Sequence, residues 1–366
     1  MSKSYTPGLK ILENTKIIKE RKLPLKGDIK CNLGDKVKNN EVVASTFLPG
    51  NIHMINVANQ LNIDPNTIND FVCVEINQEV KRGDVLAENN GLFGFFKTQV
   101  ESKFNGKISN ISKSTGQILI SDPEIPIEIN AFVDGTIVDV ISNEGVIVES
   151  YGALIQGIIG VGGEKTGQII FENDSDNDND FENKIVIVKN SIDKKLYDQY
   201  SKKGAVGIIC GGFHYESLSD ILGYKLGVAI TGTENIKTTL IVTEGFGQVE
   251  MSDKTYNILK KYKNQIASIN GATQIRAGVI RPELIIPFEN TNDNYKELNE
   301  QDLVISKESK VRVIRQPYFG SIGIIVDLPK DPVVIESETK ARVAEVEFTN
   351  GERKLVPRAN LEIILE

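Results

Sequence analysis

The sequence predicts a multidomain α+β protein with a strand-rich N-terminal half, a small α/β domain with parallel strands, and a C-terminal β-barrel. Three observations support this: apolar residues alternate with polar ones up to about residue 172, a β-α-β spacing begins at Lys184, and alternating segments return after Lys310. The expected units are 1–125, a β domain with a short helical insertion at 55–70; 126–172, further hairpins of the same region; 173–182, an acidic linker; 183–290, the α/β domain; 291–306, a linker; and 307–366, the barrel.

A short pattern occurs twice in the N-terminal half. Leu33–Ala44 and Ile76–Ala87 both place an apolar residue before a polar turn, a valine after it, and an apolar pair at the end. Such a repeat predicts one supersecondary unit, a short hairpin, that is used twice. Between the copies, Asp64 and Pro65 are typical of the N-cap and first residue of a short helix.

The α/β domain is predicted from two apolar runs around a helical segment. Lys184–Val188 and Ala205–Cys210 are typical of buried strands, and Ser191 is the expected N-cap of a helix that ends at Gly204. The spacing predicts a parallel pair with a right-handed crossover. A further helix is expected to begin after Ser252.

The C-terminal segment resembles a KOW module, the small SH3-like barrel of NusG-type transcription factors and several ribosomal proteins. The Asn350-Gly351 turn between alternating runs predicts a hairpin. The pieces that carry the resemblance are Val311-Arg-Val313, Pro317-Tyr-Phe319, Gly323-Ile-Ile-Val326 and Val343-Ala-Glu-Val346. The resemblance implies a docking surface for RNA or protein, with candidate contacts at Lys310, Arg312, Arg315, Tyr318, Phe319 and Arg358. A purely structural barrel without a partner is the alternative.

The second repeat resembles the barrel-sandwich hybrid of biotinyl and lipoyl carriers and of RnfC-type electron-transfer subunits. Glu79–Ala87 followed by Ser102–Ile108 carries this resemblance. A carrier presents a lysine at a hairpin tip, but that position here is Phe95, and Lys97 lies two residues out of register. We therefore expect the fold without the carrier function. The whole chain is similar to a multidomain family of unassigned activity that combines these regions.

Composition argues against several classes of protein. The formal net charge is −8, whereas a chain that binds nucleic acid over much of its surface is usually basic. Cys31, Cys73 and Cys210 are isolated, which favours a reducing compartment over a disulfide framework. The first residues contain no apolar signal region, and no apolar run reaches membrane length. We expect a cytoplasmic protein without a membrane partner.

Small-molecule binding is expected, if anywhere, at the carboxyl ends of the parallel strands. Glycines, hydroxyls and arginines there could hold a phosphate or carboxylate. The candidates are Thr231, Gly232, Thr233, Thr243, Gly245, Thr273, Gln274, Arg276 and Arg281. Cys210 and His214 could form a nucleophile pair, although a cysteine that ends a buried strand is more often a packing residue.

Other familiar sites are not predicted. Gly157–Gly167 is rich in glycine but precedes no helical pattern, so it matches neither a phosphate loop nor a dinucleotide fingerprint. Asp174–Asp180 begins like a calcium loop, but Asn179 and Ile185 stand where that loop needs glycine and glutamate. No Cys/His set has zinc spacing. We expect no metal site, no cofactor and no catalytic residues.

These observations favour a non-enzymatic cytoplasmic adaptor or assembly protein with a protein or ribonucleoprotein partner, and possible self-association. One alternative is a factor associated with RNA, the ribosome or RNA polymerase, favoured if Lys310, Arg312, Arg315 and Arg358 share one face. The other is an enzyme or enzyme subunit that binds an anionic small molecule between Thr231 and Arg276.

Overall fold

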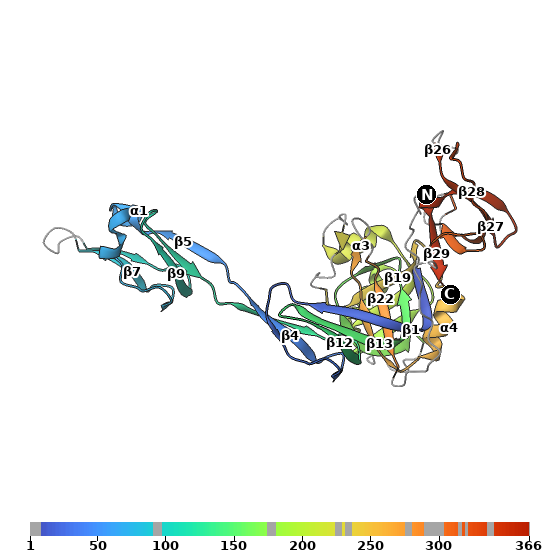
Figure 1. Cartoon of the computed structure of the whole chain (residues 1–366), viewed down its shortest axis with the longest axis horizontal. Coiled ribbons are helices and arrows are strands. Elements are labelled where there is room, and N and C mark those ends of the chain that lie inside the picture. Colours follow the sequence, from blue (N-terminus) through green and yellow to red (C-terminus); the bar gives the residue numbers. More distant parts are fainter. Residues whose placement is uncertain are drawn as a thin grey trace.

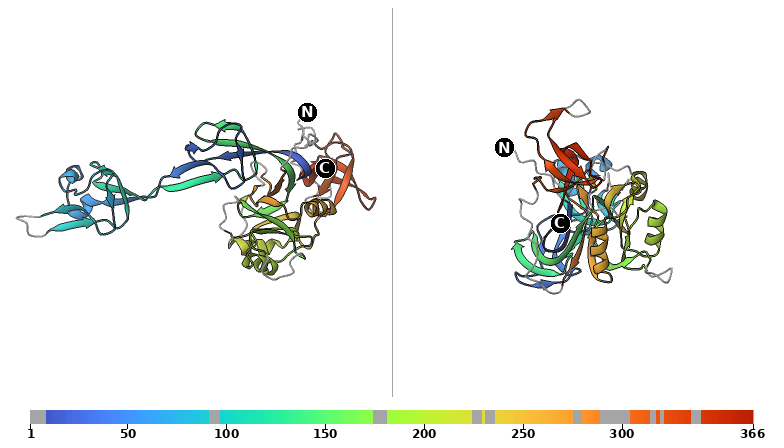
Figure 2. Two further views of the ribbon diagram at one scale, coloured as in Figure 1. Left: turned by 90° about the horizontal axis from the view of Figure 1, so that it is seen from below. Right: turned by 90° about the vertical axis from the view of Figure 1, so that its right-hand side faces the viewer.

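Strands dominate an elongated molecule, in which a slender arm leaves a larger body (Figures 1 and 2). The computed structural model describes residues 9–90, 97–173, 181–223, 229–230, 236–274, 280–288, 304–313, 317–318, 321–334 and 340–365. A large mixed sheet runs through the body and continues into the C-terminal module. The expectation of a strand-rich, multidomain protein is confirmed.

The body is organised around a long antiparallel ribbon. It consists of β1 (Leu9–Lys22) and β13 (Gly145–Gln156), paired along most of their lengths. From β13 the sheet continues through β22 (Glu283–Pro287), β20 (Ile266–Asn270), β15 (Lys165–Phe171), β16 (Lys184–Val188), β17 (Gly207–Phe213), β19 (Thr239–Phe246) and β14 (Ile159–Val161). The four strands β15, β16, β17 and β19 run parallel to one another.

Helices cover both faces of this parallel part. Ile185 and Ile187 of β16 pack in one core cluster with α4 (Asp253–Lys261). Val186 and Val188 point to the other cluster, which contains residues of α2 (Lys194–Lys202) and α3 (Tyr215–Leu222). Because both faces are buried, these strands are continuous apolar runs rather than alternating ones.

The helix starts follow local capping chemistry. The hydroxyl of Ser252 accepts a hydrogen bond from Thr255 N at the start of α4, as predicted. Helix α2 begins at Asp193 rather than at the predicted Ser191, because the Asp193 carboxylate accepts from Leu196 N at 2.8 Å. The predicted parallel β16–α2–β17 unit is confirmed.

The C-terminal module is an antiparallel set of strands joined to the body. Its strands are β23 (Lys310–Val313), β24 (Ile322–Asp327), β25 (Val333–Val334), β26 (Lys340–Ala341), β27 (Val343–Phe348), β28 (Arg353–Pro357) and β29 (Leu361–Leu365). The predicted hairpin turn is confirmed, with Gly351 at φ +82° between β27 and β28. Strand β29 also pairs in parallel with the start of β1, so the two ends of the described chain meet in one sheet.

The predicted division at residues 173–182 does not separate two sheets. Strands β1, β13 and β15 were expected in the N-terminal β region, but they lie in the same sheet as β16 and β17. Alternation of apolar and polar residues identifies a strand but not its pairing partner. The sequence pattern therefore could not show that β1, β13 and β15 belong to this sheet.

The arm consists of an inner module and a tip module. The inner module contains β2 (Asp28–Ile29), β3 (Lys36–Val37), β4 (Val42–Leu48), β11 (Ile125–Asn130) and β12 (Gly135–Ile141). The tip module contains β5 (Ile52–Asn56), α1 (Val57–Leu61), a 3₁₀ helix (Pro65–Asp70), β6 (Glu79–Val80), β7 (Val85–Asn89), β8 (Thr98–Glu101), β9 (Gly106–Ser112) and β10 (Gln117–Ser121).

The two modules repeat one another in detail. Strand β3 pairs with β12 as β6 pairs with β9. The amide of Asn39 donates to the Asp134 carboxylate at 2.8 Å, and the amide of Arg82 donates to the Asn105 side-chain oxygen at the same distance. The repeat predicted from sequence is therefore real, but its strands pair with distant segments rather than with each other as a hairpin.

The tip module is inserted at the end of a hairpin of the inner module. Strands β4 and β11 of the inner module correspond to β7 and β8 of the tip module, and both pairs carry a bulge at the same place. The equivalent register pairs are Val42↔Asn130 with Ala44↔Ile129, and Val85↔Glu101 with Ala87↔Val100. The arm is long because the tip module is inserted between β4 and β11 of the inner module.

Candidate functional site

The predicted anion site lies where the parallel strands end against the C-terminal module. Thr231, Gly232, Thr233 and Arg276 lie outside the described residues. The described candidates are Thr243, Gly245, Thr273, Gln274 and Arg281, and none of them lines either of the two grooves described below.

The candidate threonines hold backbone segments together. The buried Thr243 hydroxyl donates to Cys210 O at 3.2 Å. The buried Thr273 hydroxyl accepts from Gly160 N at 2.8 Å, and Thr273 and Gln274 form β21, which pairs with β18 (Ala229–Ile230). These hydroxyls are engaged within the fold, and they do not point to a ligand.

Arg281 is neutralised by the chain itself. Its guanidinium donates to the carboxylate of Glu362 at 2.5 Å and to Ile158 O at 3.1 Å. Glu362 is fully buried and comes from β29 of the C-terminal module. The predicted role of Arg281 as an anion ligand is therefore replaced by an internal ion pair.

Arg312 is also internal, and the prediction that it contacts a partner is wrong. Only 2% of its surface is exposed. Its guanidinium forms an ion pair with Glu244 at 2.9 Å and donates to the main-chain oxygens of Thr243 and Glu244 at 3.2 and 3.3 Å. A guanidinium from β23 thus fills the strand-end position where the sequence predicted a small ligand.

Together these side chains form a buried cluster of two cations and two anions, which we call the junction cluster: Glu244, Arg281, Arg312 and Glu362. Burial raises the pKa of Glu362, an effect that the neighbouring Arg281 and Arg312 oppose. Three of its polar atoms, Arg281 Nε, Arg312 Nε and Glu362 Oε2, have no hydrogen-bond partner among the described residues. The cluster joins the C-terminal module to the body.

Sequence reasoning missed the two glutamates of the junction cluster. Arg312 stands between Val311 and Val313, and Glu362 stands between Leu361 and Ile363. The two are register partners on β23 and β29. A signal was present, because an arginine and a glutamate each interrupt an apolar run within one module.

The remaining candidate contacts of the C-terminal module do not form a basic face with Arg312. Arg358 donates to Val343 O and Pro329 O at 3.0 and 2.9 Å. The Tyr318 ring packs against Phe348 with centroids 5.5 Å apart. Lys310 is exposed on β23, while Arg315 and Phe319 lie outside the described residues. Three other described cations of the module are paired with its acids: Lys307 with Asp327, Arg353 with Glu347 and Lys354 with Glu352.

Cys210 is unsuited to nucleophilic chemistry in this structure. It is fully buried, and burial raises the pKa of its thiol, which donates to Gly212 O at 3.3 Å. His214 is the N-cap residue of α3 and is exposed. The interpretation of Cys210 as a packing residue fits this environment.

Thiol reactivity should follow burial. In the native protein we expect the exposed Cys73 to react first with a thiol reagent. Cys31 should react more slowly, because burial and the nearby Asp35 and Glu41 raise its pKa, and Cys210 should react only after unfolding. Mass spectrometry after timed alkylation measures this order, and early modification of Cys210 would contradict the buried site.

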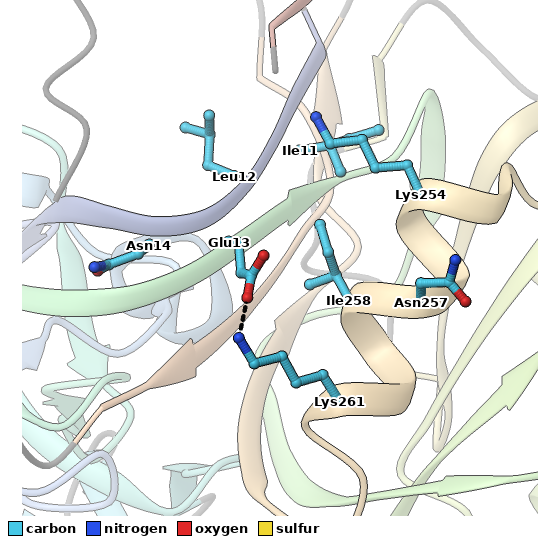
Figure 3. A pocket seen from close by; sticks show the side chains of 8 residues that line it. All are labelled: Ile11, Leu12, Glu13, Asn14, Lys254, Asn257, Ile258 and Lys261. Atoms are coloured by element: carbon cyan, nitrogen blue, oxygen red, sulfur yellow. Dashed lines mark hydrogen bonds and ion pairs between the residues drawn. The ribbon is translucent and has the colours of Figure 1, made fainter. Parts of the chain in front are cut away.

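Two grooves of the described surface each contain an ion pair. The first lies between β1 and α4, has a volume of about 710 Å³, and is crossed by an ion pair between Glu13 and Lys261 (Figure 3). The second has a volume of about 540 Å³ at the base of the arm, where Arg21 makes a forked ion pair with Glu164 at 2.6 and 2.7 Å. Neither groove gathers a recognisable catalytic set.

Lys97 is held at the side of the tip hairpin. Its ammonium group forms an ion pair with Glu88 at 2.8 Å. Residues 91–96, including Phe95, lie outside the described part of the chain. Among the described residues, no group of three or more His, Cys, Asp or Glu side chains is arranged to hold a metal ion.

No helix in the described part of the chain has the length and apolar character needed to cross a membrane. Comparison with models of known protein families gives no match, and comparison with curated proteins finds no significant similarity. The resemblances to KOW modules and barrel-sandwich hybrids therefore stay predictions.

Proposed function

We propose that this chain is a non-enzymatic adaptor that docks macromolecular partners through its barrel-sandwich-hybrid-like arm and its KOW-like C-terminal module. The observation that carries the proposal is the nested arm, which holds a second module away from the body (Figure 1). A separate core supports the tip module, including Ile55, Leu86, Ile108 and Ile118. This arrangement would separate a binding surface on the tip module from one on the C-terminal module.

The use of the inner hairpin supports this reading. In carriers with this kind of fold, the hairpin end presents the modified lysine. Here the corresponding hairpin of the inner module, β4–β11, leads into an entire further module. The tip module thus occupies the hairpin end where a carrier would present its modified lysine, which favours an architectural role over group transfer.

The alternatives have weaker support. An RNA-associated role needs unpaired cations on one face, but Arg312 is buried and Arg353 and Lys354 face acids of the same module. For an enzyme that binds an anion between Thr231 and Arg276, Arg281 gives no support, because its guanidinium is bound to Glu362. The adaptor is therefore the function that the described residues support best.

The test is affinity capture from native lysate with and without nuclease, followed by mass spectrometry. Two variants separate the ends of the molecule: Ile76→Asp on the tip module and Val334→Asp on the C-terminal module, both at exposed apolar positions. We expect each variant to lose a different set of captured proteins, and both sets to survive nuclease. Recovery of the chain alone would reject the adaptor, and loss of partners on nuclease treatment would favour the RNA-associated alternative.

A further inference from the structure

Strand β5 of the tip module is an unprotected sheet edge. In the tip sheet the order is β5-β10-β9-β6, so β5 lies at the border and pairs with β10. Its outward side chains are apolar and exposed: Ile52 is 61% exposed and Met54 70%, whereas the inward Ile55 is 5% exposed. An exposed apolar edge of this kind is a template for another strand.

The main-chain groups on this edge point away from β10. Asp122 N donates to Asn51 O at 2.9 Å, and the two residues continue the β5–β10 register. In an antiparallel pair hydrogen-bonded positions alternate, so His53 and Ile55 also bond toward β10. The amide and carbonyl groups of Ile52 and Met54 consequently face the open edge.

The segment around β5 lacks the charges that normally protect an edge. No Asp, Glu, Lys or Arg occurs from Val42 to Ile63. By contrast, other border strands carry such charges, for example Glu79 on β6 and Arg353 and Lys354 on β28. Charged side chains on an edge discourage pairing with another chain, and β5 has none.

We propose that β5 pairs antiparallel with β5 of a second copy of this chain, which joins two tip modules into one continuous sheet. A two-fold axis at Met54 places the two Met54 side chains opposite each other and Ile52 opposite Asn56 of the other copy. Because the strand is uncharged, pairing like with like brings no repulsion. The strand at the opposite edge of the tip sheet, β6, differs because it carries the charged Glu79.

The arm makes this pairing sterically accessible and useful. Strand β5 borders the tip module, far from the body along the longest axis of the molecule (Figures 1 and 2). Next to the tip module, the arm narrows to the paired ends of β4 and β11, where Phe47 and Ile125 are exposed. Two strands alone are marginally stable in water, so a second copy alongside would also shield this part of the arm.

Charge reversal at one position tests the pairing. We expect the full-length chain to pass from 40.4 kDa to twice that mass as its concentration rises to about 100 µM, measured by sedimentation equilibrium, as befits a small edge-to-edge interface. Met54→Lys and Met54→Glu should each stay monomeric, because like charges would face each other across the axis. An equimolar mixture of the two variants should regain the dimer mass.

The control is Val334→Lys, at an apolar position of the C-terminal module that is 58% exposed, which should dimerise like the unmodified chain. Circular dichroism of each variant confirms folding, which substitution of so exposed a side chain should leave intact. A monomeric parent at all concentrations overturns the proposal. So does a dimer that persists in Met54→Lys alone, or a mixture of the two charge variants that stays monomeric.

Discussion

Replacing Arg312 with methionine is expected to lower the free energy of unfolding by about 3–5 kcal/mol, because the change leaves buried acids without their counter-charge. Arg312 Nη1 contacts the Glu244 carboxylate and two main-chain oxygens, and its pair is almost fully buried. After the substitution, Arg281 is the one remaining cation of the junction cluster among the described residues to balance Glu244 and Glu362. Urea unfolding followed by circular dichroism measures the loss.

Two further variants make this prediction specific. Adding Glu244→Gln to Arg312→Met should restore a large part of the stability, because the glutamine removes a buried charge and can still accept the hydrogen bond from Ser252 N. Arg353→Met is the matched control, since Arg353 pairs with Glu347 on the surface of the same module and should cost less than about 1 kcal/mol. Equal losses from Arg312→Met and Arg353→Met would show that the junction cluster is not shielded from water.

The junction cluster bears on how the adaptor would work. Burying two ion pairs is costly, and their net contribution to stability against an apolar packing is small. What such a cluster does supply is geometry, because one nitrogen of Arg312, Nη1, contacts the Glu244 carboxylate and the main-chain oxygens of Thr243 and Glu244 at once. The C-terminal module is thereby fixed to the body in a defined orientation, while the tip module extends from it on the arm.

Local elements could be predicted from the sequence because their causes are local. Ser252 caps α4, Asp64 caps the 3₁₀ helix, and Asn350-Gly351 turns between β27 and β28, each through residues only a few positions apart. Pairings between distant strands could not be predicted in this way. Nothing near Leu9 indicates that β1 adds to β29 across the whole length of the chain.

The described residues of the candidate site, Thr243, Thr273 and Arg281, are engaged within the fold, and the sequence could not show this for a related reason. Arginine and glycine near strand ends are residue types that bind anions. The same residue types also occur where two parts of a protein pack closely together. The apolar neighbours of Arg312 indicate burial, but its ion pair with Glu244 could be assigned only by knowing that β23 lies against the end of β19. The repeated pattern at Leu33 and Ile76 succeeded because repetition requires no knowledge of long-range contacts.

Gly211, which follows Cys210, also lies where two segments of the chain pack closely together. Its substitution is the second change for which we expect a large loss of stability. Gly211→Ala should destabilise the protein by about 3 kcal/mol, because a methyl group there would lie 2.3 Å from Met251 N and 2.6 Å from the carbonyl carbon of Glu250. These are main-chain atoms immediately before the Ser252 cap of α4, and Met251 N donates to Lys189 O at 2.7 Å. A shift of this backbone would disturb both the Ser252 cap and the hydrogen bond to Lys189 O.

Gly207→Ala, on the same strand, is the control. A methyl group at Gly207 would meet only side-chain atoms of Ile269 and Ile185, the nearest at 2.9 Å, so small rotations can relieve the contact and the loss should be about 1 kcal/mol. Thermal and urea unfolding of both variants give the comparison. If Gly211→Ala costs no more than Gly207→Ala, the close approach of β17 to the start of α4 is not a requirement of the fold. If it costs more, Gly211 is required because the backbones of β17 and of the segment before α4 meet there.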